Sequence, residues 1–159
     1  MRLDYRKTFP EALQAMSGLE QAVEGSDLEP KLLELVKVRA SQLNGCANCI
    51  NLHATEAREA GETEQRIYLL AAWREAPCYT DRERAALAWC EALTLLPQTG
   101  APDDVYALVR EQFDDAEIVA LTLAVVAING WNRFAVGFRS PVGHYVSPHA
   151  AAAEAADGR

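Results

Sequence analysis

The sequence lacks the features that mark several large classes of protein. It has 15 lysines and arginines against 23 aspartates and glutamates, a formal net charge of -8. Nucleic acids and anionic membrane surfaces need a basic face, so we expect neither as a partner. The glycine-rich phosphate loops of nucleotide-binding proteins and the GxSxG motif of hydrolases are also absent.

Long apolar runs are missing as well. The first residues contain no apolar core of signal-peptide length, and the longest apolar run, Ile118 to Ile128, is shorter than the ~20 residues of a membrane span. We therefore expect a cytoplasmic protein without a membrane partner. The chain of 159 residues is long enough for one domain with its own core, which we place at 1–146. The Ala-rich tail, 147–159, has little to bury, and we expect it to be disordered.

Sustained alternation of apolar and polar residues is absent too, so the sequence predicts an all-α fold. Pro10 and Pro30 suit the first position of a helix, Thr63 suits a cap, and Thr80 with Glu83 matches a capping box. The expected helices run from Pro10 to Gly25, Pro30 to Asn44, Cys46 to about Ala60, Thr63 through Trp73, Asp81 to about Leu95, Pro102 to Val109, and from about Asp115 through Ile128.

The last of these helices is apolar nearly all round until Asn129. A helix without a polar face must be buried on every side, and a small chain has little with which to cover it. We therefore expect part of its burial to come from another subunit of a homo-oligomer. Pro141 ends the part that we expect to be ordered.

Cysteine is scarce, with four residues, too few for a disulfide framework in a chain of this size. In a reducing compartment, a close pair indicates catalysis, redox sensing or metal binding. Cys46 and Cys49 form such a pair. Cys90 lies among apolar residues and is expected in the core, whereas Cys78 is expected in the core or in a loop, as a partly exposed thiol.

Cys46, Cys49 and His53 share one face of their expected helix. At 100° per residue, Cys49 lies about 60° from Cys46, and His53 returns to within about 20° of Cys46. Both cysteines fall in the first turn, where free N–H groups and the helix dipole stabilise a thiolate and can lower a cysteine pKa from about 8.5 to between about 3.5 and 7.5. His53 can accept the thiol proton or pair with the thiolate as imidazolium.

Glu34 is the fourth candidate residue of this site. It lies on the preceding helix, which must reverse at Asn44-Gly45 for both apolar faces to reach one core. That reversal can bring its carboxylate beside His53, where it would orient the ring and extend a proton path from the thiol. Leu33 and Leu35 flank Glu34, and a buried carboxylate needs such a partner.

Other interpretations of the pair compete with the redox one. Cys46 and Cys49 could be structural, or they could bind zinc together with Cys78, Cys90, His144 or His149. None of these four forms a second close pair, so the fourth zinc ligand is hard to identify. A thioredoxin fold is excluded because the residues before Cys46 are predicted to be helical. His144 and His149 are expected to be solvated, and Trp73, Trp89 and Trp131 to serve packing.

The constellation Glu34-x11-Cys46-x2-Cys49-x3-His53 resembles the alkylhydroperoxidase D-like (AhpD-like) group of the carboxymuconolactone decarboxylase family. The surrounding sequence is similar too, in NGCANC at 44–49, EAGETEQRIYLLAAWRE at 59–75, TDRERAALAWCEALT at 80–94 and AINGWNRF at 127–134. The resemblance extends from about Met1 to Gly143. It implies an AhpD-like helical bundle with the CxxC at the start of a central helix.

The resemblance also implies an activity, that of a thiol-dependent peroxidase with an antioxidant role. Cys49 would be the peroxidatic cysteine, which forms a sulfenic acid, and Cys46 would be the resolving one. His53 and Glu34 would form the proton relay, without a cofactor or metal. The substrate would be a hydroperoxide, the reductant an external thiol or dithiol, and the assembly a trimer or hexamer. The decarboxylase branch typically lacks the CxxC pair.

The sequence departs from some alkylhydroperoxidases at Asn48. Those proteins have a second histidine between the cysteines, and asparagine cannot move a proton as histidine does. Asn48 therefore motivates a second hypothesis, a general thiol–disulfide oxidoreductase or redox sensor with weak peroxidase activity. A zinc-binding or scaffold protein is the third.

Overall fold

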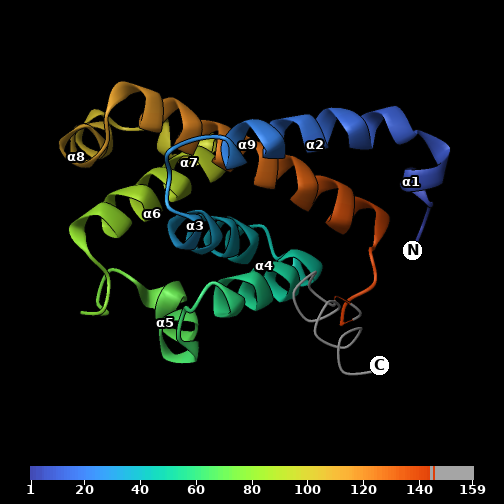
Figure 1. Cartoon of the computed structure of the whole chain (residues 1–159), viewed down its shortest axis with the longest axis horizontal. Coiled ribbons are helices and arrows are strands. Elements are labelled where there is room, and N and C mark those ends of the chain that lie inside the picture. The colour runs from blue at the N-terminus through green and yellow to red at the C-terminus, as the bar shows by residue number, and fades with distance from the viewer. Residues whose placement is uncertain (144, 146–159) are drawn as a thin grey trace, which may run out of the picture.

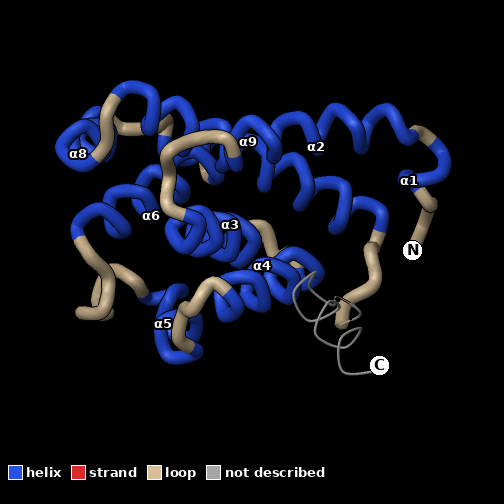
Figure 2. Tube along the Cα trace, in the orientation of Figure 1, coloured by secondary structure: helices blue, strands red, loops and turns tan. Residues whose placement is uncertain are grey.

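The computed structural model describes residues 1–143 and 145, and within them every regular element is a helix (Figure 2). The predicted all-α class is confirmed. The expected tail at 147–159, the end of the domain at residue 146, His144 and His149 all lie outside the described residues. The elements are α1 (Tyr5–Thr8), α2 (Pro10–Glu24), α3 (Pro30–Leu43), α4 (Ala47–Glu59), α5 (Glu64–Leu69), a 3-10 helix η1 (Leu70–Ala72), α6 (Asp81–Thr94), α7 (Leu96–Thr99), α8 (Asp103–Gln112) and α9 (Asp115–Phe138).

Helix α3 occupies the middle of the bundle (Figure 1). It contacts α4, α6 and α9, while α2 packs along α9 on the other side. Leu35 and Val36 of α3, Leu87 of α6, and Leu121 and Ile128 of α9 are completely buried. The helix that carries Glu34 is therefore the one held most firmly by its neighbours.

The predicted helix starts agree with the structure. Pro10 and Pro30 each stand at the start of their helices, α2 and α3, where the missing N–H costs nothing. Thr80 and Glu83 form the expected capping box of α6. Asp114 forms a second capping box, with Glu117, at the start of α9, which the sequence analysis had not predicted.

The prediction of one helix from Thr63 through Trp73 is wrong. Thr63 does cap α5, but α5 ends at Leu69 and the chain tightens into η1. The tighter turn places Leu70 and Trp73 in a second apolar cluster, where the Trp73 indole also donates to Glu91 (2.8 Å). Burial of these two side chains outweighs the regular helix that local sequence favours.

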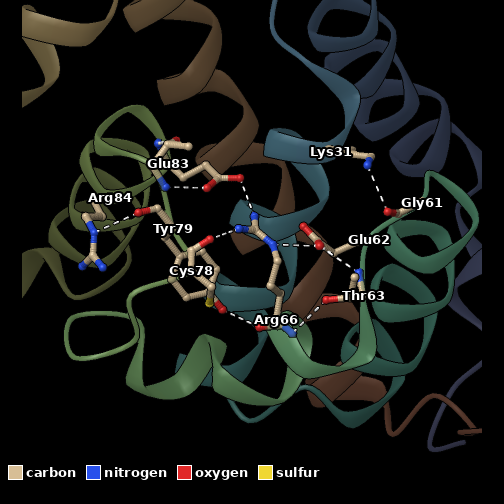
Figure 3. A network of polar contacts seen from close by, with 10 residues as sticks. Lys31, Gly61, Glu62, Thr63, Arg66, Cys78, Tyr79, Glu83 and Arg84 are labelled. Carbon is tan, nitrogen blue, oxygen red and sulfur yellow. Dashed lines mark hydrogen bonds and ion pairs between the residues drawn. The ribbon is translucent and has the colours of Figure 1, made fainter.

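A polar network fixes α5 against the loop that precedes α6 (Figure 3). Arg66 of α5 pairs with Glu62 (2.8 Å) and with Glu83 of α6, and it donates to the carbonyl of Cys78. The Tyr79 hydroxyl donates back to the Arg66 carbonyl. Cys78 lies in this loop and is half-buried, as predicted, while Cys90 is fully buried in the core.

Two short helices, α1 and α7, were not predicted. Each has four residues, too few to produce an apolar period. The first is held by contacts distant in sequence: the Tyr5 ring lies 5.2 Å from each of the Phe134 and Phe138 rings, and the Arg2 amide donates to the Phe138 carbonyl (2.7 Å). The N-terminal segment is thereby fastened to the end of α9.

Helix α9 continues ten residues past Ile128, to Phe138, and is longer than its uninterrupted apolar run. By length and composition alone it could cross a membrane, but a core helix meets the same criterion, and α9 packs against α2, α3 and α6. In the single chain Val119 is 68% exposed and Val126 is 53% exposed. A second subunit would cover both side chains. The homo-oligomer stays a prediction.

Candidate redox site

A tight turn joins α3 to α4 and sets the position of Cys46. Asn44 caps α3, and Gly45 takes the left-handed conformation (φ 63°) that glycine adopts without strain. The Gly45 amide donates to the Gln42 carbonyl (3.2 Å) and the Cys46 amide to the Ser41 carbonyl (2.9 Å). This is the Schellman pattern, which satisfies the last carbonyls of α3. The predicted reversal at Asn44-Gly45 is confirmed.

Helix α9 anchors this turn through a buried amide network. The Asn44 side chain donates to Asn132 (2.8 Å) and contacts Asn129 (3.0 Å). Asn132, which is 1% exposed, donates in turn to the Ser41 hydroxyl (3.1 Å). Because buried amides are costly unless they are paired, this network holds the start of α4 in one place. In the sequence, Asn129 marks the end of an apolar run, and the spacing of these residues does not predict the network.

Cys46 and Cys49 are joined as a disulfide, with their Cα atoms 5.4 Å apart. Cys46 is the N-cap of α4 rather than its first residue, and its sulfur accepts the Cys49 amide (3.3 Å). Both side chains are buried, Cys46 at 1% exposure and Cys49 at 4%. Both pack in the main apolar core, but Cys49 also lines a cavity of about 500 Å³, whereas Cys46 is not among the residues that line it.

Glu34 and His53 meet as expected, with Glu34 Oε2 2.8 Å from His53 Nδ1. Burial would raise the pKa of Glu34, but the hydrogen bond and charge of His53, with Lys37 close by, outweigh it and leave that pKa below its ordinary value. An ionised carboxylate can only accept, so Nδ1 carries a proton. The second ring nitrogen, Nε2, is then the one available to exchange a proton at the site.

Two charged residues of the site were missed by the sequence analysis. Lys37, one turn after Glu34, places its ammonium 3.1 Å from Glu34 Oε1 and 3.3 Å from Glu20 of α2. Its spacing from Glu34 is an ordinary i,i+3 pair, which is common on solvated helix faces. Only the placement of α2, which packs along α9, reveals the largely buried Glu20–Lys37–Glu34 cluster.

The cavity combines this reactive side with an aromatic and aliphatic one. Glu34, Lys37, Cys49 and His53 line it together with Asn48. The apolar side chains of its wall are Leu52 of α4 and, from α1 and α9 at a distance along the chain, Tyr5, Trp131 and Ala135. Trp131 therefore has a position at the site as well as the packing role that was predicted.

The described residues do not supply a set of ligands for the zinc hypothesis. Among residues 1–143 and 145, no three His, Cys, Asp or Glu side chains are grouped so that they could hold a metal ion. Cys78 and Cys90 are free thiols, and they lie in a loop and in the core respectively. The candidates His144 and His149 lie outside the described part of the chain.

The fold and the site define a class, that of all-α proteins with a CxxC dithiol at the start of a helix. The carboxymuconolactone decarboxylase family model matches residues 10–92, and the chain belongs to this family. The matched segment contains Glu20, Glu34, Lys37, Cys46, Cys49 and His53. Tyr5 and Trp131, which line the opposite part of the cavity, lie outside it.

Individual relatives agree with this membership. The chain is 43% identical over 135 residues to the uncharacterized protein YdfG of Bacillus subtilis, covering 85% of this chain and 92% of that one. A crystal structure from Agrobacterium tumefaciens, of a protein of unknown function proposed to be the antioxidant defence protein AhpD, superposes with a TM-score of 0.87. That match has 49% identity and covers 91% of this chain and 99% of that one.

More distant structures share the fold alone. The debrominase Bmp8 superposes with a TM-score of 0.78 at 16% identity, over 87% of this chain and 74% of that one. An alkylhydroperoxidase AhpD core protein from Ralstonia eutropha gives a TM-score of 0.77 at 17% identity, over the same shares of the two chains. The same bundle thus occurs in proteins that carry different names.

Proposed function

We propose that this protein is a thiol peroxidase that reduces hydroperoxides with the Cys46–Cys49 dithiol. The observation that carries the proposal is the placement of Cys49, at the wall of a cavity that His53 and Glu34 also line, with Cys46 close enough to bond to it. Because Cys49 lines the cavity and Cys46 does not, Cys49 would meet the peroxide first. The supporting likeness is to the proposed antioxidant protein from Agrobacterium tumefaciens.

The chemistry follows in three balanced steps. The Cys49 thiolate attacks the outer oxygen of ROOH, the O–O bond breaks, and the departing RO⁻ takes a proton through His53 to become ROH. The Cys46 thiol then displaces water from the Cys49 sulfenic acid and forms the disulfide. Two equivalents of an external thiol, or one dithiol, reduce the disulfide and leave as a new disulfide. A reducing cytoplasm would supply that thiol.

Anaerobic titration of the reduced protein with an organic hydroperoxide tests this function. We expect one equivalent of peroxide to be consumed per chain, with one alcohol formed and the Cys46–Cys49 disulfide detected by mass spectrometry. Cys78 and Cys90 are expected to stay reduced, since one lies in a loop outside the site and the other is fully buried. Reduced protein that leaves the peroxide unconsumed for an hour would contradict the proposal.

The apolar part of the cavity leads to a prediction about substrate choice. Replacing Trp131 with alanine removes an indole that lines the cavity, and we expect kcat/KM for cumene hydroperoxide to fall about tenfold, the usual scale for lost apolar contact with a substrate. Hydrogen peroxide is too small to use that surface, so its rate should change less than about twofold. Stopped-flow oxidation with both peroxides measures the difference.

Tyr68→Ala is the matched control for that experiment, because Tyr68 is an aromatic residue on α5 that is 73% exposed. It should leave both rates unchanged. Equal losses for cumene hydroperoxide and hydrogen peroxide in Trp131→Ala would show that the indole supports the fold of the site and does not select the substrate.

A general thiol–disulfide oxidoreductase is the second candidate function. The observation that favours it is Asn48, which lines the cavity beside Cys49 and offers no titratable group. For such a protein, the reduced dithiol would react slowly with peroxide and rapidly with a small disulfide. Stopped-flow rates with both oxidants on the same protein separate the two candidates.

A further inference from the structure

A buried ammonium group lies behind the proposed relay. The Lys37 side chain is 8% exposed, and its Nζ is held between Glu34 of its own helix (3.1 Å) and Glu20 of α2 (3.3 Å). Lysine is seldom buried without a reason, because removing its charge from water costs several kcal/mol unless acceptors replace the water. Here two carboxylates replace it, and all three side chains line the cavity that Cys49 lines.

The three charges form a chain that continues into the site. Glu20 contacts Lys37, Lys37 contacts Oε1 of Glu34, and Oε2 of the same carboxylate contacts His53 (2.8 Å). Both oxygens of Glu34 are therefore occupied, one by a lysine and one by the histidine. A carboxylate held at both oxygens has one orientation, which fixes the ring of His53 in turn.

We propose that Lys37 is a positioning residue of the redox site: it holds Glu34 against His53 and adds a positive charge that favours the Cys49 thiolate, and Glu20 moderates that charge. This role of Lys37 deepens the proposed function, and its part in peroxide reduction rests on that function. Lys37 and Glu20 act through Glu34 and through the field in the cavity, and neither is required to touch the substrate.

The protonation states of Lys37 and Glu34 agree with this role. Burial would lower the pKa of Lys37, but the charges and hydrogen bonds of Glu34 and Glu20 outweigh it and raise that pKa above 10.5. The pKa of Glu34 lies below 4.5. The ammonium and the carboxylate are therefore both charged at neutral pH.

Other groups around the cavity contribute to its field. Besides Glu20, α2 provides Glu24, and α1 provides Tyr5 and Arg6; α4 provides Cys49, His53 and Glu56, and the lining residues of α9, Trp131 and Ala135, are uncharged. Glu24 and Arg6 are exposed, so water screens them more than it screens the buried Lys37. Replacing Lys37 should accordingly shift the pH midpoint of Cys49 more than replacing Glu24 or Arg6.

The test measures the pH midpoint for alkylation of Cys49 by iodoacetamide. The reduced protein carries Cys46→Ser and Cys78→Ser, so that Cys49 is the thiol that reacts, Cys90 being fully buried. In this background Lys37→Met should raise the midpoint by about one pH unit, which lowers the reaction rate at a pH below the midpoint about tenfold. Lys37→Arg keeps the charge and should restore the midpoint to within about 0.3 unit.

Lys31→Met is the matched control for loss of charge. Lys31 stands on the same helix, but its ammonium donates to the Gly61 carbonyl (3.0 Å) at an exposed position outside the cavity. The midpoint should not move in this variant. A shift equal to that of Lys37→Met would show a general effect of net charge and overturn the proposal.

Glu20→Gln supplies a second variant with the opposite sign. Removal of this carboxylate leaves the charge of Lys37 uncompensated on one side, so the midpoint should fall, and Lys37→Met with Glu20→Gln together should return close to the starting value. If Lys37 had only a structural role, each variant would have a lower melting temperature and an unchanged midpoint. That outcome would also overturn the proposal. Alkylation requires no peroxide, so the readout stands even if peroxide reduction fails.

Discussion

Cys49→Ser should abolish peroxide reduction, lowering kcat/KM by roughly 10³-fold or more, as removal of a catalytic nucleophile does. The serine hydroxyl fills almost the same volume, but it ionises far less readily than a thiol, and no sulfenic acid can form on it. Because Cys49 is 4% exposed and packs among core residues, the isosteric change should leave the melting temperature within a few degrees of the original. Peroxide consumption coupled to a thiol reductant gives the rate.

Cys46→Ser is the informative partner of that variant. It keeps the cysteine that faces the cavity, so it should consume one equivalent of peroxide and then stop, with a sulfenic acid on Cys49 that dimedone traps. Turnover should also be lost, because the step that forms the disulfide is missing. If Cys49→Ser instead gave the trapped sulfenic acid on Cys46, the assignment of the two cysteines would have to be exchanged.

Cys90→Ala and Cys78→Ser serve as thiol controls. Cys90 is fully buried and its sulfhydryl contacts the Val36 carbonyl (3.4 Å), which leaves it no access to peroxide, and burial raises its pKa to about 12. Cys78 lies half-buried in the loop before α6. Both variants should retain full turnover. Loss of turnover in either one would implicate a thiol outside the proposed site.

The geometry of the candidate site could be predicted from sequence because it is local. Cys46, Cys49 and His53 share a face by helical periodicity, and the glycine at position 45 marks the reversal that brings Glu34 to His53. These inferences require two helices and one turn. The prediction that Glu34 lies beside His53 held because α3 and α4 are consecutive and are joined by a Schellman turn.

The remaining part of the site depends on contacts that sequence spacing does not contain. Glu20 reaches Lys37 only because α2 packs along α9 next to the central helix, and Trp131 and Tyr5 reach the cavity from the two ends of the chain. A lysine three residues after a glutamate is typical of solvated helix faces. Burial is what makes Lys37 unusual, and burial is a property of the assembled bundle.

The fold shows the same division between local and distant causes. Prolines at the first helical position predicted where α2 and α3 begin, and capping residues predicted where α5 and α6 begin, because both signals act within one turn. The break after Leu69 could not be predicted in this way, since it depends on Leu70 and Trp73 finding their places in the core. An interruption of this kind carries no glycine or proline signal at the position where it occurs.

His53→Gln should lower kcat/KM for peroxide about 10²-fold, the lower end of what a general acid or base contributes. Glutamine can still donate to Glu34, so the buried carboxylate keeps a partner and the protein should fold. It cannot exchange protons, however, and the departing RO⁻ would have to take its proton from water. The loss should therefore be smaller for hydroperoxides whose alcohols are more acidic, a dependence that stopped-flow rates with a series of hydroperoxides can measure.

Glu34→Gln separates the orientation of His53 from its proton transfer. Glutamine can donate to Nδ1 as well as accept from it, so the ring loses its fixed tautomer while it can still exchange a proton, and a smaller loss of about tenfold is expected. Glu34→Gln should also change the stability of the protein in acid. Because the pKa of Glu34 is lowered in the folded protein, its ionised form adds stability that is fully present above the ordinary value of 4.5 and lost as the pH falls through the lowered one. Melting temperatures below pH 4.5 should accordingly fall less steeply in Glu34→Gln than in the unmodified protein; parallel curves would mean that Glu34 is not held ionised by its partners.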